Sequence, residues 1–169
     1  MAADDGSGPT DGLDTFVRKL QPGRVSESIE TRLQRLEDLH EITQLVIDYG
    51  EHLDAGNFDA YAALFAADGE VLLGPMGRAT GRAEIARFMT EMLADRVGST
   101  FHVISSPRIT LDGDTATATV MWSVATLADD GLARVSMVGH HHDDLVRTLG
   151  GWRFRRRRGT VDLPATYPV

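Results

Sequence analysis

Apolar residues beyond residue 25 recur at steps of three and four, the spacing that places side chains on one face of an α-helix. The longest such run extends from Ile29 to Leu53. Gly56 follows it and can adopt the left-handed conformation that ends helices, and Asn57 can cap a second helix. The pattern therefore predicts one long amphipathic helix that is complete by Gly56.

Two shorter helices are expected next. The first has its apolar stripe over residues 58–65 and is stopped by Asp68 and Gly69, before a brief strand at residues 70–73. The second opens after Gly81, and its inner face carries Ile85, Phe88, Met89, Met92 and Leu93. The first half of the chain is therefore predicted to be helical, with one strand among the helices.

The periodicity changes from 3.6 to 2 after Ser99, which predicts strands. Their expected ranges are residues 100–105, 108–111, 115–127, 132–148 and 152–161. Turn residues separate them, so consecutive strands should pair antiparallel, and the two longest must bend or bulge. The predicted class is α+β: three N-terminal helices packed on a strongly curved, mostly antiparallel mixed sheet. Such a sheet wrapped against a long helix forms a cone, and the open end suits a small molecule.

Composition narrows the possible roles of this domain. The 169 residues suffice for one domain, and the net charge of −8 disfavours broad contact with nucleic acid or anionic lipid. There is no cysteine, which excludes disulfides, thiolate zinc sites and cysteine nucleophiles. An acidic N-terminus and the lack of a long apolar run favour a cytoplasmic location without a membrane span. We expect a flexible tail over residues 1–25, the domain over 26–163, and a short tail over 164–169.

Two residues distant in the sequence are candidates for acid–base chemistry. Asp54 comes about one and a half helical turns after Tyr49, so both side chains are expected near the same end of the long helix. His102 has Phe101 and Val103 as neighbours and faces the opposite side from both. If that side is concave, a carboxylate can hold one imidazole nitrogen and leave the other free to take a proton. The simpler alternative is that Asp54 only starts a turn and His102 is a partly exposed strand residue.

Several segments resemble the SnoaL-like branch of the nuclear transport factor 2-like superfamily. They are residues 49–59 (YGEHLDAGNFD), 64–68 (LFAAD), 80–82 (TGR), 100–109 (TFHVISSPRI) and 151–154 (GWRF). The resemblance extends from about residue 36 to residue 154 and implies a cone-shaped α+β barrel. Scytalone dehydratase, lindane dehydrochlorinase and bile-acid 7-alpha-dehydratase in this branch use a histidine–aspartate pair, which falls on His102 and Asp54. A functional tyrosine of the bile-acid enzyme falls on Tyr49.

The resemblance implies a lyase or isomerase, most often a dehydratase, that needs no cofactor and no metal. His102 would remove a proton, Asp54 would orient His102, and Tyr49 would donate a hydrogen bond to an oxygen that gains charge or leaves. The implied substrate is an apolar, cyclic small molecule of steroid, polyketide or aromatic type. The resemblance also implies a homodimer or homotrimer.

Four further residues are candidates for substrate binding. Arg157 falls near a cavity arginine of the dehydrochlorinase, although an arginine-rich run such as 153–158 more often belongs to a solvated or subunit-facing strand. His141 and Asp143 would face into the cone as polar pocket residues, with a subunit contact as the alternative. Trp122 is either a core residue or a flat cavity wall.

The run of three histidines invites a metal-site interpretation. His140, His142 and Asp144 would share one strand face, roughly the ligand set of a two-histidine, one-carboxylate iron site. The resembling family needs no metal, so we favour the interpretation without one. A second strand-borne histidine of scytalone dehydratase falls on Val124 or a neighbour here. The water-handling arrangement of that enzyme is therefore not expected in this chain, and we expect a different substrate.

Two alternatives to this enzyme stay open. One is a non-catalytic ligand-binding or assembly module of the same superfamily, with its cone filled by side chains. The other is an epoxide hydrolase or cyclase of the same architecture, although the two acids joined by an arginine that the hydrolase needs have no assignable match. A cleft at His102 and Asp54, as opposed to a filled interior, distinguishes the enzyme from the module.

Overall fold

The computed structural model describes residues 27–164 except residue 106. The chain divides into two compact units, residues 1–34 and 35–169, which are described separately. In the first unit, Ser28 caps the helix that follows: its Oγ accepts the backbone N–H of Thr31 at 3.1 Å. The expected N-terminal tail lies outside the described residues, as do residues 165–169 of the expected C-terminal one.

Three α-helices are present among the described residues: α2 (Ile29–Asp54), α3 (Phe58–Ala63) and α4 (Arg82–Leu93). Two short 3-10 turns occupy Gly74–Met76 and Ala94–Arg96. The apolar stripe predicted for the long helix is buried only from Ile42 onward in the second unit, since Leu36 is exposed. None of the described helices is long and apolar enough to cross a membrane.

The strands form one mixed sheet with the order β2-β1-β7-β6-β5-β3, and β4 pairs with β5 beside β3. The bounds are β1 Phe65–Leu72, β2 Arg78–Thr80, β3 Thr100–Ile104, β4 Arg108–Asp112, β5 Thr115–Leu127, β6 Ala133–Thr148 and β7 Gly151–Pro164. The β1–β7 pair is parallel and all other pairs are antiparallel. The predicted fold class is confirmed, and the sheet stays open instead of closing into a barrel.

Three predictions about the elements were wrong in detail. The second helix ends at Ala63, and β1 begins at Phe65 because that residue pairs in parallel with Phe154 of β7. The short strand β2 was not expected, and it pairs antiparallel with β1. Finally, β3 and β4 do not pair with each other but follow one another along the same edge of β5.

The long strands bulge as expected, and one bulge determines which arginine is buried. Asp144 is paired with Arg156 and Leu145 with Phe154, so Arg155 is an extra residue in β7. If β7 had no bulge, Phe154 and Arg157 would lie on opposite faces of the sheet, because they are three positions apart and side chains alternate along a strand. With it, both are fully buried on the same face.

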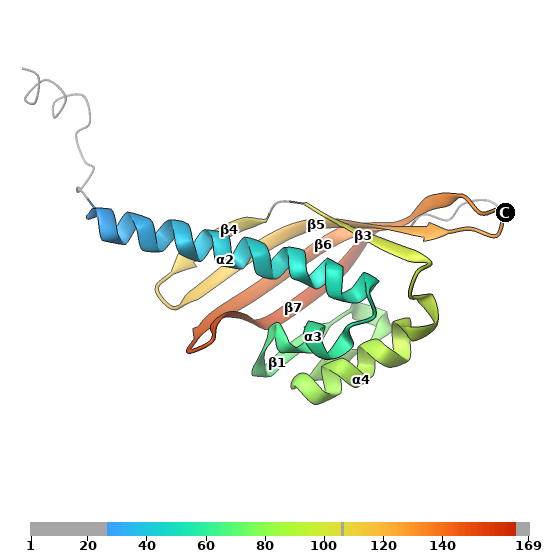
Figure 1. The fold of residues 1–169 in the computed structure, drawn as a ribbon, viewed down its shortest axis with the longest axis horizontal. Helices are drawn as coiled ribbons and strands as arrows, with labels where there is room; N and C mark the ends of the chain where they lie inside the picture. Colours follow the sequence, from blue (N-terminus) through green and yellow to red (C-terminus); the bar gives the residue numbers. More distant parts are fainter. Residues whose placement is uncertain (1–26, 106, 165–169) are drawn as a thin grey trace, which may run out of the picture. The chain divides into compact units, whose positions relative to one another are not determined.

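In the second unit, residues 35–54 of α2 lie across one face of the sheet, and α3 and α4 pack beside β1 (Figure 1). Asp38 fixes α2 at one end of this face. Its two carboxylate oxygens accept hydrogen bonds from Arg147 at 2.6 Å each, and Oδ1 also accepts Trp152 Nε1–H at 3.2 Å. The core lies between α2 and the sheet and includes Tyr49, Tyr61, Phe65, Val120 and Phe154. We call this covered side the inner face of the sheet.

Candidate active site

The C-terminal residue of α2 is bound to the edge strand β3. Asp54 Oδ1 lies 2.6 Å from His102 Nδ1, and Asp54 Oδ2 accepts the backbone N–H of His102 at 2.8 Å. The two side chains are only 19% and 11% exposed. Because β3 is at the edge of the sheet there, its outward N–H groups have no strand partner, and the carboxylate can take one of them. The helix end and the strand are therefore joined through one carboxylate.

This contact fixes the chemistry available to His102. A carboxylate accepts hydrogen bonds only, so Nδ1 carries a proton and the neutral ring keeps its lone pair on Nε2. Among the described residues, no hydrogen bond occupies Nε2. When Nε2 takes a proton, the negative charge of Asp54 stabilises the imidazolium ion. The pair has the geometry of a general base held by an orienting carboxylate.

A groove of about 470 Å³ runs along this pair. It is lined by Ile47, Gly50, Glu51, Asp54, Ala55, Phe101, His102 and Ile104. Phe101 is 63% exposed, so the groove offers apolar surface to solvent. A Cβ at Gly50 would lie 3.0 Å from Ile104 Cγ1, so the glycine permits the close approach of α2 and β3. The pair is thus bordered by a surface groove between α2 and β3.

Tyr49 is buried in the core next to the His102–Asp54 pair. Its ring meets those of His102 and His141 edge-on, with centroid distances of 6.2 and 5.0 Å. Its Oη lies 3.4 Å from His141 Nε2. Burial raises the pKa of Tyr49 to about 12, so the hydroxyl stays protonated at neutral pH.

Arg157 and Asp143 form a fully buried ion pair. Arg157 Nε and Nη2 donate to the two carboxylate oxygens at 2.8 and 2.7 Å. Burial opposes the charge on Arg157, but Asp143 outweighs this effect and raises the pKa of the guanidinium. The guanidinium carbon also lies 4.2 Å from the ring centre of Tyr49 and 3.9 Å from that of Phe154. The solvated-strand alternative is therefore wrong for Arg157, although it holds for Arg155, which is exposed.

His141 completes the buried group. Burial and then the charge of Arg157 lower the pKa of His141 well below 6.5, so the imidazole is neutral. Its ring is stacked on Trp122 with a centroid distance of 5.4 Å. His141 and Asp143 are buried within this chain, so a subunit contact does not explain them. The structure thus joins Asp54 to His102, Arg157 to Asp143, and His141 to both Tyr49 and Trp122.

The other residues of the histidine run lie on the outer face of the sheet. The rings of His140 and His142 stack at 6.3 Å, and His140 Nδ1 bonds to Asp162. Asp144 lies 4.0 Å from Arg156. Within residues 27–164, leaving out 106, no group of three or more acidic or histidine side chains is arranged to hold a metal ion.

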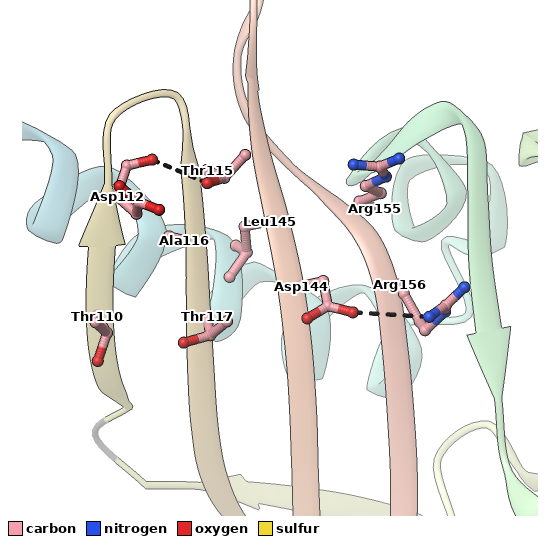
Figure 2. A pocket seen from close by; sticks show the side chains of 9 residues that line it. All are labelled: Thr110, Asp112, Thr115, Ala116, Thr117, Asp144, Leu145, Arg155 and Arg156. Atoms are coloured by element: carbon pink, nitrogen blue, oxygen red, sulfur yellow. Dashed lines mark hydrogen bonds and ion pairs between the residues drawn. The ribbon is translucent and has the colours of Figure 1, made fainter.

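A second hollow of about 540 Å³ lies over β4, β5, β6 and β7 (Figure 2). Its lining includes Thr110, Thr117, Asp144, Arg155 and Arg156, which are exposed on the outer face. None of the seven residues predicted from the sequence lines it. Although this hollow is larger than the groove at His102, no histidine is among the residues that line it.

Sequence reasoning missed Gly50, Glu51, Phe101 and Tyr61. The first three border the groove, and Tyr61 is a fully buried tyrosine whose hydroxyl lies in the interior. A glycine inside a long helix is unfavourable, and this cost was the available signal for a close approach. Tyr61 gave no comparable signal, because a tyrosine in an apolar helical stripe is an ordinary core residue.

Comparison with known proteins places this arrangement of helices and sheet in a fold class. The chain resembles a nuclear transport factor 2-like protein with a cystatin-like fold from Novosphingobium aromaticivorans, with a TM-score of 0.77 and 29% identity. That match covers 83% of this chain and 94% of the other. A candidate scytalone dehydratase from the same organism has a TM-score of 0.63 at 24% identity, covering 80% of this chain and 91% of that one, and shares the fold.

Residues 34–158 match the SnoaL-like domain, so the chain belongs to that family. The predicted family is thereby confirmed. The uncharacterized protein Rv2910c of Mycobacterium tuberculosis is 29% identical over 124 residues, which are 72% of this chain and 84% of that protein.

Proposed function

We propose that this protein is a cofactor-independent lyase or isomerase, most simply a dehydratase, with His102 as its base. The observation that carries the proposal is the double contact of Asp54 with the ring and the backbone of His102. It holds Nε2 with its lone pair free, beside a groove that a small molecule can enter. Family membership supports the same role, since the resembling enzymes use this pair of residue types.

The reaction begins with transfer of a carbon-bound proton to His102 Nε2. The proton comes from a carbon next to a carbonyl group, and the electron pair of the broken C–H bond forms an enolate. In a dehydration, a hydroxyl on the neighbouring carbon then leaves with the proton from His102 as water. In an isomerisation, His102 returns the proton to a different carbon instead.

Tyr49 is proposed to donate a hydrogen bond to the oxygen that gains charge. Its pKa of about 12 keeps the hydroxyl proton in place, which a donor needs. The position of its ring between His102 and His141 supports this role. Trp122, His141, Asp143 and Arg157 are proposed to shape the interior in which the substrate is bound.

The proposed substrate is an apolar, cyclic molecule of steroid, polyketide or aromatic type. Ile47, Phe101 and Ile104 give the groove an apolar lining. Association into a homodimer or homotrimer and a cytoplasmic location belong to the same proposal. They are supported by the family resemblance and the composition respectively, and light scattering after size exclusion measures the first.

The test replaces the base while keeping its contact with Asp54. In His102→Asn, the side-chain amide can still donate to the carboxylate, but no group replaces Nε2. We expect proton–deuterium exchange of 2-tetralone, and elimination from a panel of cyclic β-hydroxy ketones, to fall by about 100-fold or more. Nuclear magnetic resonance measures the exchange.

The control is His142→Asn, which alters an exposed histidine on the outer face. It should leave both rates unchanged. Equal rates for wild type and His102→Asn would refute the assignment of the base. Binding of the ketone by wild type with no exchange and no elimination would favour the non-catalytic module.

A further inference from the structure

Four buried polar atoms on the inner side have no hydrogen-bond partner among the residues that the structure describes. They are Tyr61 Oη, Trp122 Nε1, His141 Nδ1 and Arg157 Nη1. Folded proteins rarely leave such atoms without partners, because a buried donor that loses its bond to water must regain one elsewhere. Four of them in one region of a small domain point to a partner from outside the chain.

These four side chains form one connected group around Tyr49. The ring of Tyr61 lies 5.5 Å from that of Tyr49, and the guanidinium carbon of Arg157 lies 4.2 Å from the same ring. The ring centroid of His141 lies 5.0 Å from that of Tyr49. The ring of Trp122 is stacked on His141, with a centroid distance of 5.4 Å. We call Tyr49, Tyr61, Trp122, His141 and Arg157 the Tyr49 cluster.

The Tyr49 cluster is rich in hydrogen-bond donors. Trp122 Nε1 and Arg157 Nη1 only donate, and the hydroxyl of Tyr61 is able to donate. A partner that satisfies them must therefore bring acceptor atoms. Oxygen of a carbonyl or hydroxyl group is the simplest acceptor on an otherwise apolar molecule.

Charge determines which kind of oxygen fits. Asp143 neutralises Arg157 through Nε and Nη2, which leaves Nη1 as a donor without leaving a net positive charge. His141 is held neutral in the same surroundings. A carboxylate here would be a buried anion with no compensating cation, which is strongly unfavourable. The Tyr49 cluster therefore suits an oxygen that is uncharged when the ligand binds, such as that of a ketone.

The Tyr49 cluster adjoins the proposed base. His102 is paired with Val124, and Trp122 lies two residues along on the same face of β5. The ring of Tyr49 lies 6.2 Å from that of His102. The Tyr49 cluster is therefore a direct neighbour of His102 on the inner face.

We propose that the Tyr49 cluster is a binding subsite for an uncharged acceptor oxygen of the substrate, with Tyr61 and Trp122 as donors beside Arg157. The assignment rests on the proposed function for its statement that the ligand is the substrate of His102. It makes the substrate a cyclic ketone or hydroxy ketone, and it excludes hydrocarbons, halogenated hydrocarbons and carboxylates.

Tyr61→Phe is the most informative variant. It removes only the hydroxyl and keeps the ring contacts with Tyr49 and Phe65. Removal of a buried hydroxyl without a protein partner should leave the free energy of unfolding unchanged or raised. We expect the affinity for 2-tetralone to fall five- to tenfold, while the affinity for tetralin, which lacks the oxygen, changes less than twofold. Wild type should bind 2-tetralone more tightly than tetralin or tetralin-2-carboxylate.

Trp122 provides a direct signal of the bond. No residue of the described part of the chain accepts a hydrogen bond from its indole N–H, whereas the indole N–H of Trp152 donates to Asp38 and serves as an internal reference. On titration with 2-tetralone, the nitrogen–proton resonance of Trp122, assigned by its loss in Trp122→Phe, should move downfield while that of Trp152 stays. With tetralin neither should move downfield.

Several outcomes overturn the subsite: no preference of wild type for the ketone, including no binding of either ligand; equal losses for both ligands in Tyr61→Phe; or tighter binding of the carboxylate. Titrating His102→Asn with 2-tetralone and tetralin tests the subsite separately from the base, because this variant keeps the Tyr49 cluster and lacks Nε2. Ketone binding that depends on Tyr61 but is never followed by exchange in wild type overturns the base and keeps the subsite. Exchange that is unaffected by Tyr61→Phe, with unchanged affinity, overturns the subsite alone.

Discussion

At the scale of single residues, Asp54 does two things with one carboxylate. One oxygen holds the ring of His102 and the other holds its backbone N–H, so ring orientation and strand position depend on the same side chain. Both contacts require acceptors. An amide in place of the carboxylate offers one acceptor and one donor, and it carries no charge to stabilise an imidazolium ion.

Asp54→Asn should therefore lower the exchange rate by about 100-fold or more while the affinity for the ketone changes little, because the loss concerns proton transfer. Exchange kinetics over a range of ketone concentrations separate the two quantities. Asp48→Asn, on the same helix, serves as the matched control. A rate for Asp54→Asn within threefold of wild type would remove Asp54 from the mechanism.

His141 gives the stability of the fold a dependence on pH. Its pKa in the folded protein is well below the ordinary value of about 6.5, chiefly because it is buried. At a pH below 6.5, His141 is protonated in the unfolded chain but stays neutral in the folded chain. The free energy of unfolding should therefore fall as the pH falls below 6.5, with a slope that approaches about 1.4 kcal/mol per pH unit from this group.

Urea unfolding at pH 7.5 and pH 5.5 measures this effect, and His141→Gln should flatten the difference between the two. His142→Gln, which changes an exposed neighbour, should keep it. If the difference survives His141→Gln unchanged, the acid sensitivity comes from other groups.

At the scale of elements, α2 is attached to the sheet near both ends of its part in the second unit. Asp54 joins it to β3, and Asp38 joins it to β6 and β7 through Arg147 and Trp152. Arg147 also donates to Asp114 at 2.9 Å, but that carboxylate is largely exposed. The two partners of Arg147 thus differ in burial, and so in how well water can replace the contact.

Asp38→Asn should destabilise the protein by about 2 kcal/mol, because it weakens a bidentate contact and removes a charge that the partly exposed Arg147 faces. Asp114→Asn, the matched control on the same arginine, should cost less than about 0.5 kcal/mol. Chemical denaturation gives both values. Equal losses would show that burial does not distinguish the two contacts.

The element scale also shows what the sequence could and could not predict. Periodicity identified β5 with its correct ends, and alternation put His102 on the opposite side of its strand from Phe101 and Val103, because both depend on local pattern. Which of the two sides is the inner one was not predictable in this way. The early start of β1 depends on pairing of Phe65 with Phe154, nearly ninety positions away, which no local pattern contains. Arg155 is similar: strict alternation in β7 cannot reveal a bulge that the partner strand imposes.

At the scale of the whole second unit, the two faces of the sheet differ in chemistry. The inner face holds His102, the buried ion pair and the Tyr49 cluster, whereas the outer face carries exposed threonines, histidines and arginines. The predicted assembly into dimers or trimers would use surface of the second kind, and it stays a prediction. Both faces arise from the same strands, so a change of pairing in one strand exchanges residues between them.

The extra residue in β7 has a consequence for comparing members of this family. Deletion of Arg155 alone would remove the bulge and keep Arg157 opposite Asp143 on the inner face, because Phe154 and Arg157 would then be two positions apart. Two homologues that differ by this one residue can therefore bury the equivalent arginine at different sequence distances from the preceding aromatic residue. The arginine equivalent to Arg157 is therefore identified by its strand partner, Asp143, and an alignment without a gap in this segment would match a different arginine to it.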